Sequence, residues 1–402
     1  MGTKLAELNT GDALTHQKKT TPNGQTHMVT VAKTAGVSPF SQMLQMMGLR
    51  RAPNFLMANE YYEFQLYRPE LSKAEKREFI GERGSVVLNL KLSPPGMTHM
   101  RGFLSDKAAL TTLYGAWGLP TTKLRAVFSP HRRFGNLTTL RNAAEVEAWL
   151  LAQDRFPIFG KPAKGLQALG SVRIDAVDRA GSLIRLSTGR EVGLSDLAKE
   201  VAGNAENGYV FQDVVAQHSA INAMIGSQNV STLRVVTVVE NDQPKVLYTV
   251  WKLGSAKAMS DNFWQAGSLI VHVDASSGVV LKCRYGSGTA TQWVKCHPET
   301  GADILGTKVP NFEKAVDLAL EAHGAFPING ILGWDIALTP EGACLIECNE
   351  NTGHALYQYA ADRGVMNPEF TAIFDRIIAA NEKRDAAFDE KRKAHLAQKA
   401  KF

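Results

Sequence analysis

The sequence predicts an α+β protein in which a helical N-terminal region precedes mixed helices and strands. Three patterns carry this prediction. Between Pro39 and Phe79, apolar residues recur at helical spacing and β-branched residues are few. From Lys123 onward, short runs rich in β-branched and aromatic residues alternate with helical runs. The segment 331–349 then contains two apolar runs joined by Thr-Pro-Glu-Gly, which is typical of a β-hairpin.

The composition is that of a globular chain with more than one domain. Of its 402 residues, 44% are hydrophobic, which is enough for two or three packed cores. The net charge of +6 suits an anionic small molecule as well as RNA, and therefore does not by itself indicate a nucleic-acid partner. We expect none. No stretch approaches the roughly 20 apolar residues of a membrane span, and no signal peptide is apparent. The 4 cysteines lack zinc-like spacing, so free thiols and a cytoplasmic location are expected.

These patterns divide the chain into five parts. Residues 1–31 are polar with little periodicity, which predicts a flexible tail, and residues 32–104 form the helical region. Residues 105–215 and 216–380 are expected to form two α+β subdomains. Residues 381–402 are dense in charge, which indicates a solvated C-terminal helix rather than a nucleic-acid arm.

Within the first subdomain, a helix is expected to begin near Lys107, capped by Ser105 or Asp106 and stopped before Pro120. Helical runs near 143–153 and 194–203 then alternate with the strand-like runs LRAVF, PIFGKP, SVRI, LIRLS and YVFQDVV. The second subdomain is expected to contain a helix near 312–324, the final hairpin, and the strands TLRVVTVVE, KVLYTVWKL, SLIVHVD and GVVLKCRY.

The hairpin carries three oxygen-bearing side chains. If its loop is the three residues 340–342 with Gly342 left-handed, Asp335 lies directly opposite Glu347. Because side chains alternate along a strand, Asn349 shares the face of Glu347. A loop of two or four residues would turn Asp335 to the other face. The same alternation predicts that Cys344 and Cys348 share a face.

Facing carboxylates repel each other unless a cation or a proton lies between them. Hard oxygen ligands suit magnesium, which shares substrate phosphates, so the hairpin is a candidate metal site. The alternative is a surface hairpin with solvated acids, which an isolated D-x(11)-E-x-N pattern favours.

Other positions are ambiguous when each is taken alone. Lys161 ends a strand before a glycine-containing loop, 165–170, and could meet a phosphate there or simply be solvated. The loop matches neither a Walker nor a Rossmann pattern. Arg234 lies inside a strand, where burial requires an anion, either a phosphate or a neighbouring acid. His218 follows a strand, and a single histidine is more often structural. Turn formation explains Asp261 and Asn262 adequately.

The order of these parts resembles the ATP-grasp superfamily. It comprises a lysine-initiated helix, a strand-end Lys-Pro with a glycine loop, a strand ending in Gln-Asp-Val-Val, an inward arginine, and Asp, Glu and Asn on a hairpin. The resemblance spans roughly residues 39–379. It is closest to the sugar-transfer-associated ATP-grasp proteins in the runs NEYYEFQLY, LSDK, FGKPAKGLQALGSV, FQDVVAQH, NVSTLRVVTV, SDNFWQAGS and GWDIAL...LIECNENTGH.

The resemblance implies the ATP-grasp fold, in which two α+β subdomains clasp ATP. It assigns phosphate contacts to two lysines, closure to a glycine loop, adenine contacts to the backbone of a connecting strand, and ribose contact to a histidine. In this chain those residues are Lys107 and Lys161, the loop from Gly165 to Gly170, then Gln212, Asp213 and Val214, and finally His218.

The resemblance further implies that Asp335, Glu347 and Asn349 hold Mg²⁺, here called the metal triad. Many ATP-grasp ligases carry an arginine two residues before the metal-binding Asp, where this chain has Gly333. Arg234 or Lys252 would then supply the catalytic positive charge.

The reaction typical of such enzymes joins small-molecule carboxylate and amine substrates through an acylphosphate. We therefore expect an ATP-dependent ligase whose substrates resemble the amino acids or amino sugars of polysaccharide or secondary-metabolite biosynthesis. Two alternatives use the same nucleotide site. One is a phosphotransferase acting on a sugar or hydroxyl acceptor, and the other is a non-catalytic nucleotide-binding protein, which the complete metal triad disfavours.

Overall fold

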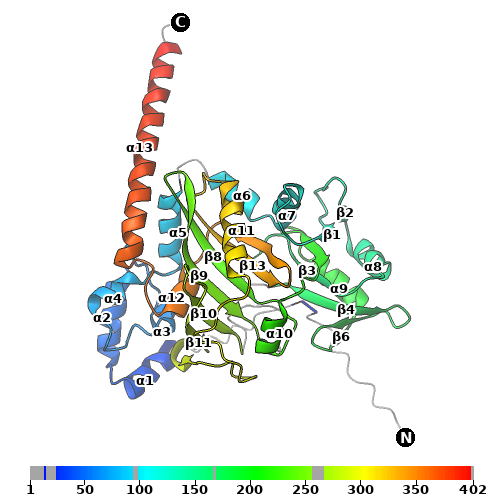
Figure 1. Ribbon diagram of the computed structural model, residues 1–402, viewed down its shortest axis with the longest axis horizontal. Helices are drawn as coiled ribbons and strands as arrows, with labels where there is room; N and C mark the ends of the chain where they lie inside the picture. Colours follow the sequence, from blue (N-terminus) through cyan, green and yellow to red (C-terminus); the bar gives the residue numbers. More distant parts are fainter. Residues whose placement is uncertain (1–12, 15–23, 94–97, 166–168, 256–266, 400–402) are drawn as a thin grey trace.

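The computed structural model describes residues 13–14, 24–93, 98–165, 169–255 and 267–399. Figure 1 shows two sheets, with helices α1 to α4 on one side of the second sheet and the first sheet on the other. The helices before the sheets are α1 (Gly24–Thr34), α2 (Pro39–Leu49), α3 (Ala58–Glu63), α4 (Lys73–Glu78), α5 (Glu82–Leu92), α6 (Thr98–Leu104) and α7 (Lys107–Ala116).

The first sheet has the strand order β2-β1-β7-β3-β4-β5-β6. Its strands are β1 (Leu124–Phe128), β2 (Thr138–Leu140), β3 (Ile158–Pro162), β4 (Val172–Asp178), β5 (Leu183–Leu186), β6 (Glu191–Gly193) and β7 (Tyr209–Asp213). Helices α8 (Ala143–Leu151) and α9 (Leu194–Ala202) pack their apolar side chains with this sheet into one buried cluster.

The second sheet has the order β12-β11-β10-β9-β8-β13-β14. Its strands are β8 (Thr232–Glu240), β9 (Gln243–Leu253), β10 (Leu269–Val273), β11 (Val280–Tyr285), β12 (Gln292–Trp293), β13 (Ile331–Thr339) and β14 (Gly342–Asn349). The accompanying helices are α10 (Ser219–Ile225), the 3₁₀ turn η1 (Gly288–Ala290), α11 (Phe312–Gly324), α12 (Ala355–Ala361) and α13 (Pro368–Lys399).

Both faces of the second sheet are covered. Because side chains alternate along a strand, Leu233 and Val235 of β8 pack in the cluster with α11, while Val236 and Val238 pack in the cluster with α12 and the N-terminal helices. Arg234 and Asp335, described below, lie on the same face of the sheet as Val236 but outside the apolar cluster that contains Val236.

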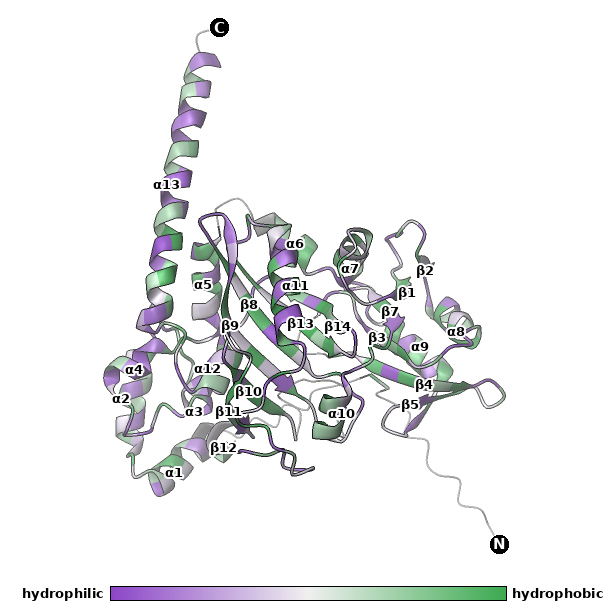
Figure 2. Cartoon of the chain, viewed as in Figure 1, coloured by the Kyte–Doolittle hydropathy of each residue, from purple (hydrophilic) through white to green (hydrophobic). Residues whose placement is uncertain are grey.

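The predicted α+β class and helical N-terminal region are confirmed. The predicted tail extends too far, because α1 begins at Gly24 and Val31 is fully buried. Helix α13 continues to Lys399, and in Figure 1 its outer half extends away from both sheets. Hydrophilic residues recur along that half in Figure 2. Among the described residues, no helix is long and apolar enough to cross a membrane.

Candidate active site

The β13–β14 hairpin places Asp335 opposite Glu347, as predicted, but by a different route. The loop has two residues, because Thr339 pairs with Gly342. The predicted three-residue loop is therefore wrong. Ile336 pairs with Leu345, whereas Asp335 pairs with Glu347. The register therefore shifts between Asp335 and Ile336, and the extra residue Ile346 forms a β-bulge. This extra residue offsets the shorter loop and restores the facing of the two carboxylates.

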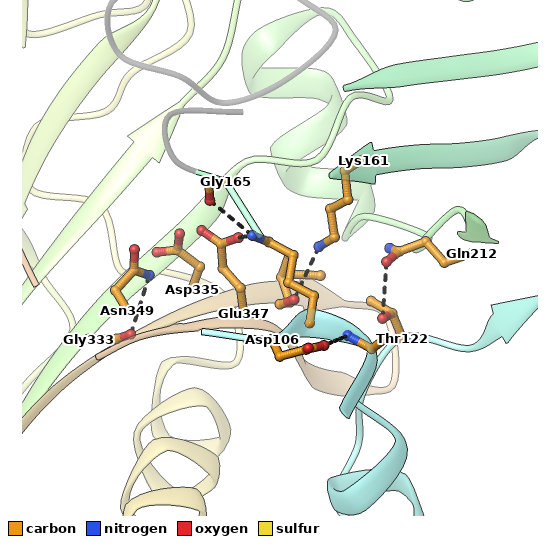
Figure 3. A network of polar contacts seen from close by, with 12 residues as sticks. Asp106, Thr122, Lys161, Gly165, Gln212, Gly333, Asp335, Glu347 and Asn349 are labelled. Carbon is orange, nitrogen blue, oxygen red and sulfur yellow. Dashed lines mark hydrogen bonds and ion pairs between the residues drawn. The ribbon is translucent and has the colours of Figure 1, made fainter. Parts of the chain in front are cut away.

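The bulge also sorts the side chains of β14 between the two faces. Asn349 pairs with Gly333, which puts it on the face of Asp335 and Glu347. Figure 3 shows these three side chains in a row on the same side of the hairpin, below Gly165.

The two hairpin cysteines do not share a face, which corrects the prediction. Cys344 pairs with Ala337 and Cys348 pairs with Trp334, which are on opposite faces of β13. The bulge at Ile346 lies between the two cysteines and reverses the alternation. Cys348 accordingly packs in the cluster with α11.

Asp335 is buried and paired with two cations. Arg234 lies directly opposite Asp335 on the neighbouring strand β8. Its guanidinium donates to both carboxylate oxygens, with Nη2 donating to Oδ2 at 2.9 Å. The Nζ of Lys252 donates to Oδ2 at 2.9 Å. Burial by itself would raise the pKa of Asp335, but these two cations outweigh it and hold the pKa well below its usual range. Asp335 is therefore a carboxylate at any ordinary pH.

Gly333 leaves room for Arg234. A Cβ at this position would lie 2.5 Å from Thr352 Oγ1 and 3.3 Å from Arg234 Cδ. The space above Gly333 is thus taken by the side chains of Thr352 and of Arg234 on the neighbouring strand. This arrangement supports Arg234, together with Lys252, as the candidate catalytic cations.

Lys107 reaches the hairpin from the first turn of α7. The side chain of Asp106 accepts hydrogen bonds from Ala108 and Ala109 N–H, so the predicted helix start and cap are confirmed. Lys107 Nζ lies 3.3 Å from Glu347 Oε2 and donates to the Gly165 carbonyl at 3.1 Å. The lysine therefore links the glycine loop of the first sheet to the hairpin of the second.

Lys161 reaches the same hairpin from β3. Its Nζ donates to the carbonyl of the bulge residue Ile346 at 3.3 Å, and the residue is only 6% exposed. Burial lowers the pKa of Lys161 to about 8, although the nearby Glu347 carboxylate opposes this shift. Because its side chain is buried, Lys161 is not the solvated lysine that the sequence left open.

The residues assigned to adenine and ribose lie on and after β7. Gln212 is buried and accepts a hydrogen bond from Thr122 Oγ1 at 3.3 Å, as Figure 3 shows. The Asp213 carboxylate is bonded by Arg125, so its side chain is committed elsewhere. Val214 follows the strand directly. The His218 ring caps α10 by accepting from Ala220 N–H at 3.2 Å, and the backbone N–H of His218 donates to the Leu338 carbonyl.

The glycine loop is described only at its ends. The Gly170 backbone has a φ of +74°, and its carbonyl accepts from Tyr209 Oη at 2.8 Å. Residues 166–168 of this loop lie outside the described residues, as do Asp261 and Asn262.

A buried polar network behind the hairpin was missed from the sequence. His354 is fully buried, with Nδ1 2.9 Å from Tyr248 Oη and Nε2 3.0 Å from Asn89 Oδ1. Asn89 also donates to the Thr352 carbonyl at 2.9 Å. Burial lowers the pKa of His354 to about 3, so its ring is neutral. In the sequence, only the polar run Glu-Asn-Thr-Gly-His directly after Asn349 indicated this network. Its burial could not be predicted from neighbouring residues in the chain.

The hairpin carries oxygen ligands of the kind that magnesium prefers, but both oxygens of Asp335 are bonded by Arg234 and Lys252 here and would have to exchange these partners for a metal. Within the described ranges, no group of three or more His, Cys, Asp or Glu side chains could hold a metal. A metal here would therefore use two carboxylates and an amide oxygen, with substrate phosphates completing its shell, as magnesium commonly does. The six charged side chains Lys107, Lys161, Arg234, Lys252, Asp335 and Glu347 carry an excess of positive charge, which suits a polyphosphate.

Comparison with solved structures found only distant similarity. N5-carboxyaminoimidazole synthase from Aspergillus clavatus matches with 12% identity and a TM-score of 0.34, over 68% of this chain and 51% of its own. D-alanine-D-alanine ligase from Coxiella burnetii matches with 10% identity and a TM-score of 0.38, over 73% and 62%. The Helicobacter pylori ligase of the same name matches with 10% identity and a TM-score of 0.40, over 71% and 63%. At these scores the solved structures carry no argument about this chain.

A search of curated proteins found no match. The family model described as sugar-transfer associated ATP-grasp matches residues 98–372, which is more than half of the chain. The matched range contains the metal triad and all four candidate cations. The chain therefore belongs to the sugar-transfer-associated ATP-grasp family.

Proposed function

We propose that this protein is an ATP-dependent carboxylate–amine ligase. One observation carries the proposal: cations from four different elements converge on the hairpin, three of them on its two facing carboxylates and Lys161 on the Ile346 carbonyl beside Glu347. Lys107 and Lys161 come from the first-sheet side, and Arg234 and Lys252 come from the second sheet. Phosphoryl transfer needs positioning and charge neutralisation rather than a protein nucleophile, and this arrangement supplies both.

In this proposal, the nucleotide lies between the two sheets. Lys107 and Lys161 exchange their present partners, the Glu347 carboxylate and the Ile346 carbonyl, for phosphate oxygens. The loop from Gly165 to Gly170 covers the phosphates. The backbone around Gln212 and Val214 meets the adenine, since the Asp213 side chain is held by Arg125. His218 lies near the ribose.

The metal triad of Asp335, Glu347 and Asn349 would hold Mg²⁺, which when bound neutralises phosphate charge and orients the phosphates. Arg234 and Lys252 stabilise the transferred group. An oxygen of the substrate carboxylate bonds to the γ-phosphorus while the bond to the β-γ bridging oxygen breaks, which gives an acylphosphate and ADP. An amine nitrogen then attacks the acyl carbon, phosphate leaves, and the ammonium proton is released to solvent.

The decisive experiment incubates the protein with ATP, Mg²⁺ and pools of carboxylates, with hydroxylamine in place of the amine. A ligase gives ADP, free phosphate and a hydroxamate, all dependent on one carboxylate pool. A phosphotransferase gives ADP without free phosphate when hydroxyl acceptors are supplied. Nucleotide binding with no ADP in either assay would overturn the enzymatic proposal.

Glu347→Gln is the matched inactive control, because it removes one charge without changing the shape of the side chain. Lys161→Ala tests the nucleotide half of the proposal separately, since it should weaken ATP binding in a binding assay without any acceptor. An unchanged dissociation constant in that variant would contradict the role given to Lys161.

A further inference from the structure

Helix α2 presents an apolar face to solvent, far from the candidate active site. Phe40, Met43, Leu44 and Met47 are 71%, 50%, 54% and 63% exposed. Their spacing of three and four residues places them on one side of the helix. These four residues are called the α2 apolar face below. Figure 1 shows α2 at the edge of the molecule beyond the second sheet.

The other side of α2 is firmly attached to the protein. Gln42 and Leu49 are buried, and Met46 packs against the cluster shared by the N-terminal helices and the second sheet. Gln42 Nε2 donates to the Val37 carbonyl at 2.7 Å, and its Oε1 accepts from Tyr62 Oη at 2.8 Å. The helix is thus held in place with its apolar face turned outward, and that face is not part of the core.

Positive charge borders the α2 apolar face. Arg50 and Arg51 follow its last turn and are exposed. A groove of about 660 Å³ adjoins this end of the helix and is lined by Met47, Arg51 and Arg77. The sequence from Gly24 to Asn59 contains no Asp or Glu. An apolar surface and a basic groove therefore meet at Met47.

Two acids of the following helices, one on α3 and one on α4, accept hydrogen bonds from backbone groups. Glu60 accepts hydrogen bonds from Met57 N–H and Glu82 N–H, both at 2.7 Å. Glu75 accepts from Ser72 N–H at 2.8 Å. These carboxylates keep their negative charge but cap helices, and none of the ion pairs between described residues involves Arg50, Arg51 or Arg77.

We propose that the α2 apolar face docks the protein onto an anionic lipid surface. An interfacial helix places apolar side chains at the boundary of the acyl chains and basic side chains against headgroup phosphates. The α2 apolar face supplies the first, and Arg50, Arg51 and Arg77 supply the second. A second copy of the chain fits less well, because residues 24–59 of the other copy would bring no acid to pair with these arginines.

The test is flotation of the full-length protein with vesicles. One set is phosphatidylcholine alone, and the other contains about one third phosphatidylglycerol. We expect binding to the anionic vesicles that is at least about tenfold stronger than to the neutral ones and that weakens with added salt, since basic side chains are attracted to anionic headgroups and salt screens this attraction. Equal binding to both compositions, or none to either, overturns the proposal.

Two variants locate the binding surface, and one control tests specificity. Phe40→Ser combined with Met47→Ser, and separately Arg50→Glu combined with Arg51→Glu, should each reduce binding about tenfold or more. Phe388→Ser, which changes a similarly exposed aromatic residue on α13, should leave binding unchanged. Equal loss in Phe388→Ser, or retention in the α2 variants, overturns the assignment. A dimer in light scattering that the Phe40/Met47 variant dissociates would instead identify a second copy as the occupant.

Discussion

Asp335 faces Glu347 across the β13–β14 hairpin because β14 contains one more residue than β13 between the turn and this pair. The extra residue is Ile346, whose carbonyl also accepts the Lys161 ammonium. The bulge therefore does two things at one position. It turns Glu347 toward Asp335, and it provides an acceptor for a cation from the other sheet.

Glu347→Gln should remove the gain in ATP affinity that Mg²⁺ provides. The amide keeps the shape of the side chain but cannot offer a negative charge to the metal. We expect the Mg²⁺-dependent gain to fall by at least about tenfold. Replacing a residue that only hydrogen-bonds a metal ligand already lowers metal affinity by about that factor, and loss of a ligand itself should cost no less. Calorimetry with ATP, with and without Mg²⁺, measures it, and an undiminished gain in the variant would exclude Glu347 as a ligand.

Asp335→Asn should destabilise the protein strongly. It leaves Arg234 and Lys252 buried without their carboxylate, and breaking a buried pair from one side costs about 3–5 kcal/mol. Glu347→Gln is the matched comparison, because its side chain is 26% exposed and its single ion pair contributes about 0–1 kcal/mol. Urea unfolding of both variants gives the difference.

Adding Lys252→Met to Asp335→Asn should recover part of this loss, because it removes one of the two buried cations that bonded the Asp335 carboxylate. Comparable unfolding midpoints for Asp335→Asn and Glu347→Gln would show that the buried ion cluster does not stabilise the fold.

Nucleotide affinity should fall as the pH rises through about 8. Lys161 has its pKa lowered to about 8, so it is charged below that pH and neutral above it. If the ammonium contacts phosphate, the dissociation constant for ADP should rise by up to about tenfold per pH unit above that point. Titrations between neutral and alkaline pH measure this slope.

Lys161→Arg is the control for this pH dependence, because arginine keeps its charge and should flatten the profile. The pH dependence of the protein's stability runs in the opposite direction, so unfolding would not explain a loss of nucleotide affinity. A lysine whose pKa in the folded protein lies below its ordinary value of 10.5 makes the fold more stable as pH rises from about 8 toward 10.5. A wild-type profile that is flat across pH 8 would separate Lys161 from phosphate binding.

Gly333→Ala should cost stability and disturb Arg234. The added Cβ would lie 2.5 Å from Thr352 Oγ1 and 3.3 Å from Arg234 Cδ, and such overpacking costs about 1–3 kcal/mol. Gly353→Ala is the control, since a Cβ there meets nothing within 4 Å. Thermal melts and ATP binding of the two variants should diverge, and identical behaviour would mean that Gly333 leaves no space that Arg234 needs.

Several features of the site could be predicted from the sequence because they depend on neighbours in the chain. Asp106 caps the helix at Lys107, since a side chain before an apolar helical run can accept from the first free N–H groups. Lys161 lies at the end of a strand, and two apolar runs joined by turn residues mark both strands of the hairpin. The facing of Asp335 and Glu347 was also correct, although the loop length behind it was not.

The remaining features required residues distant in the chain to pack together. Arg234 could pair with a phosphate or with an acid, and only the neighbouring position of β8 and β13 selected Asp335. The same is true of Lys107 on α7 and Glu347 on β14, and of His354, whose partners lie on α5 and β9.

The sequence by itself determined which segments are helices and strands and which side chains can carry the chemistry, because capping, periodicity and turn preference act over a few residues. The tertiary structure alone decided the bulge at Ile346, the burial of Lys161 and the ion pairs of Asp335. These depend on how two sheets pack, since burial and Coulomb interactions act between whichever groups the fold brings within a few ångströms.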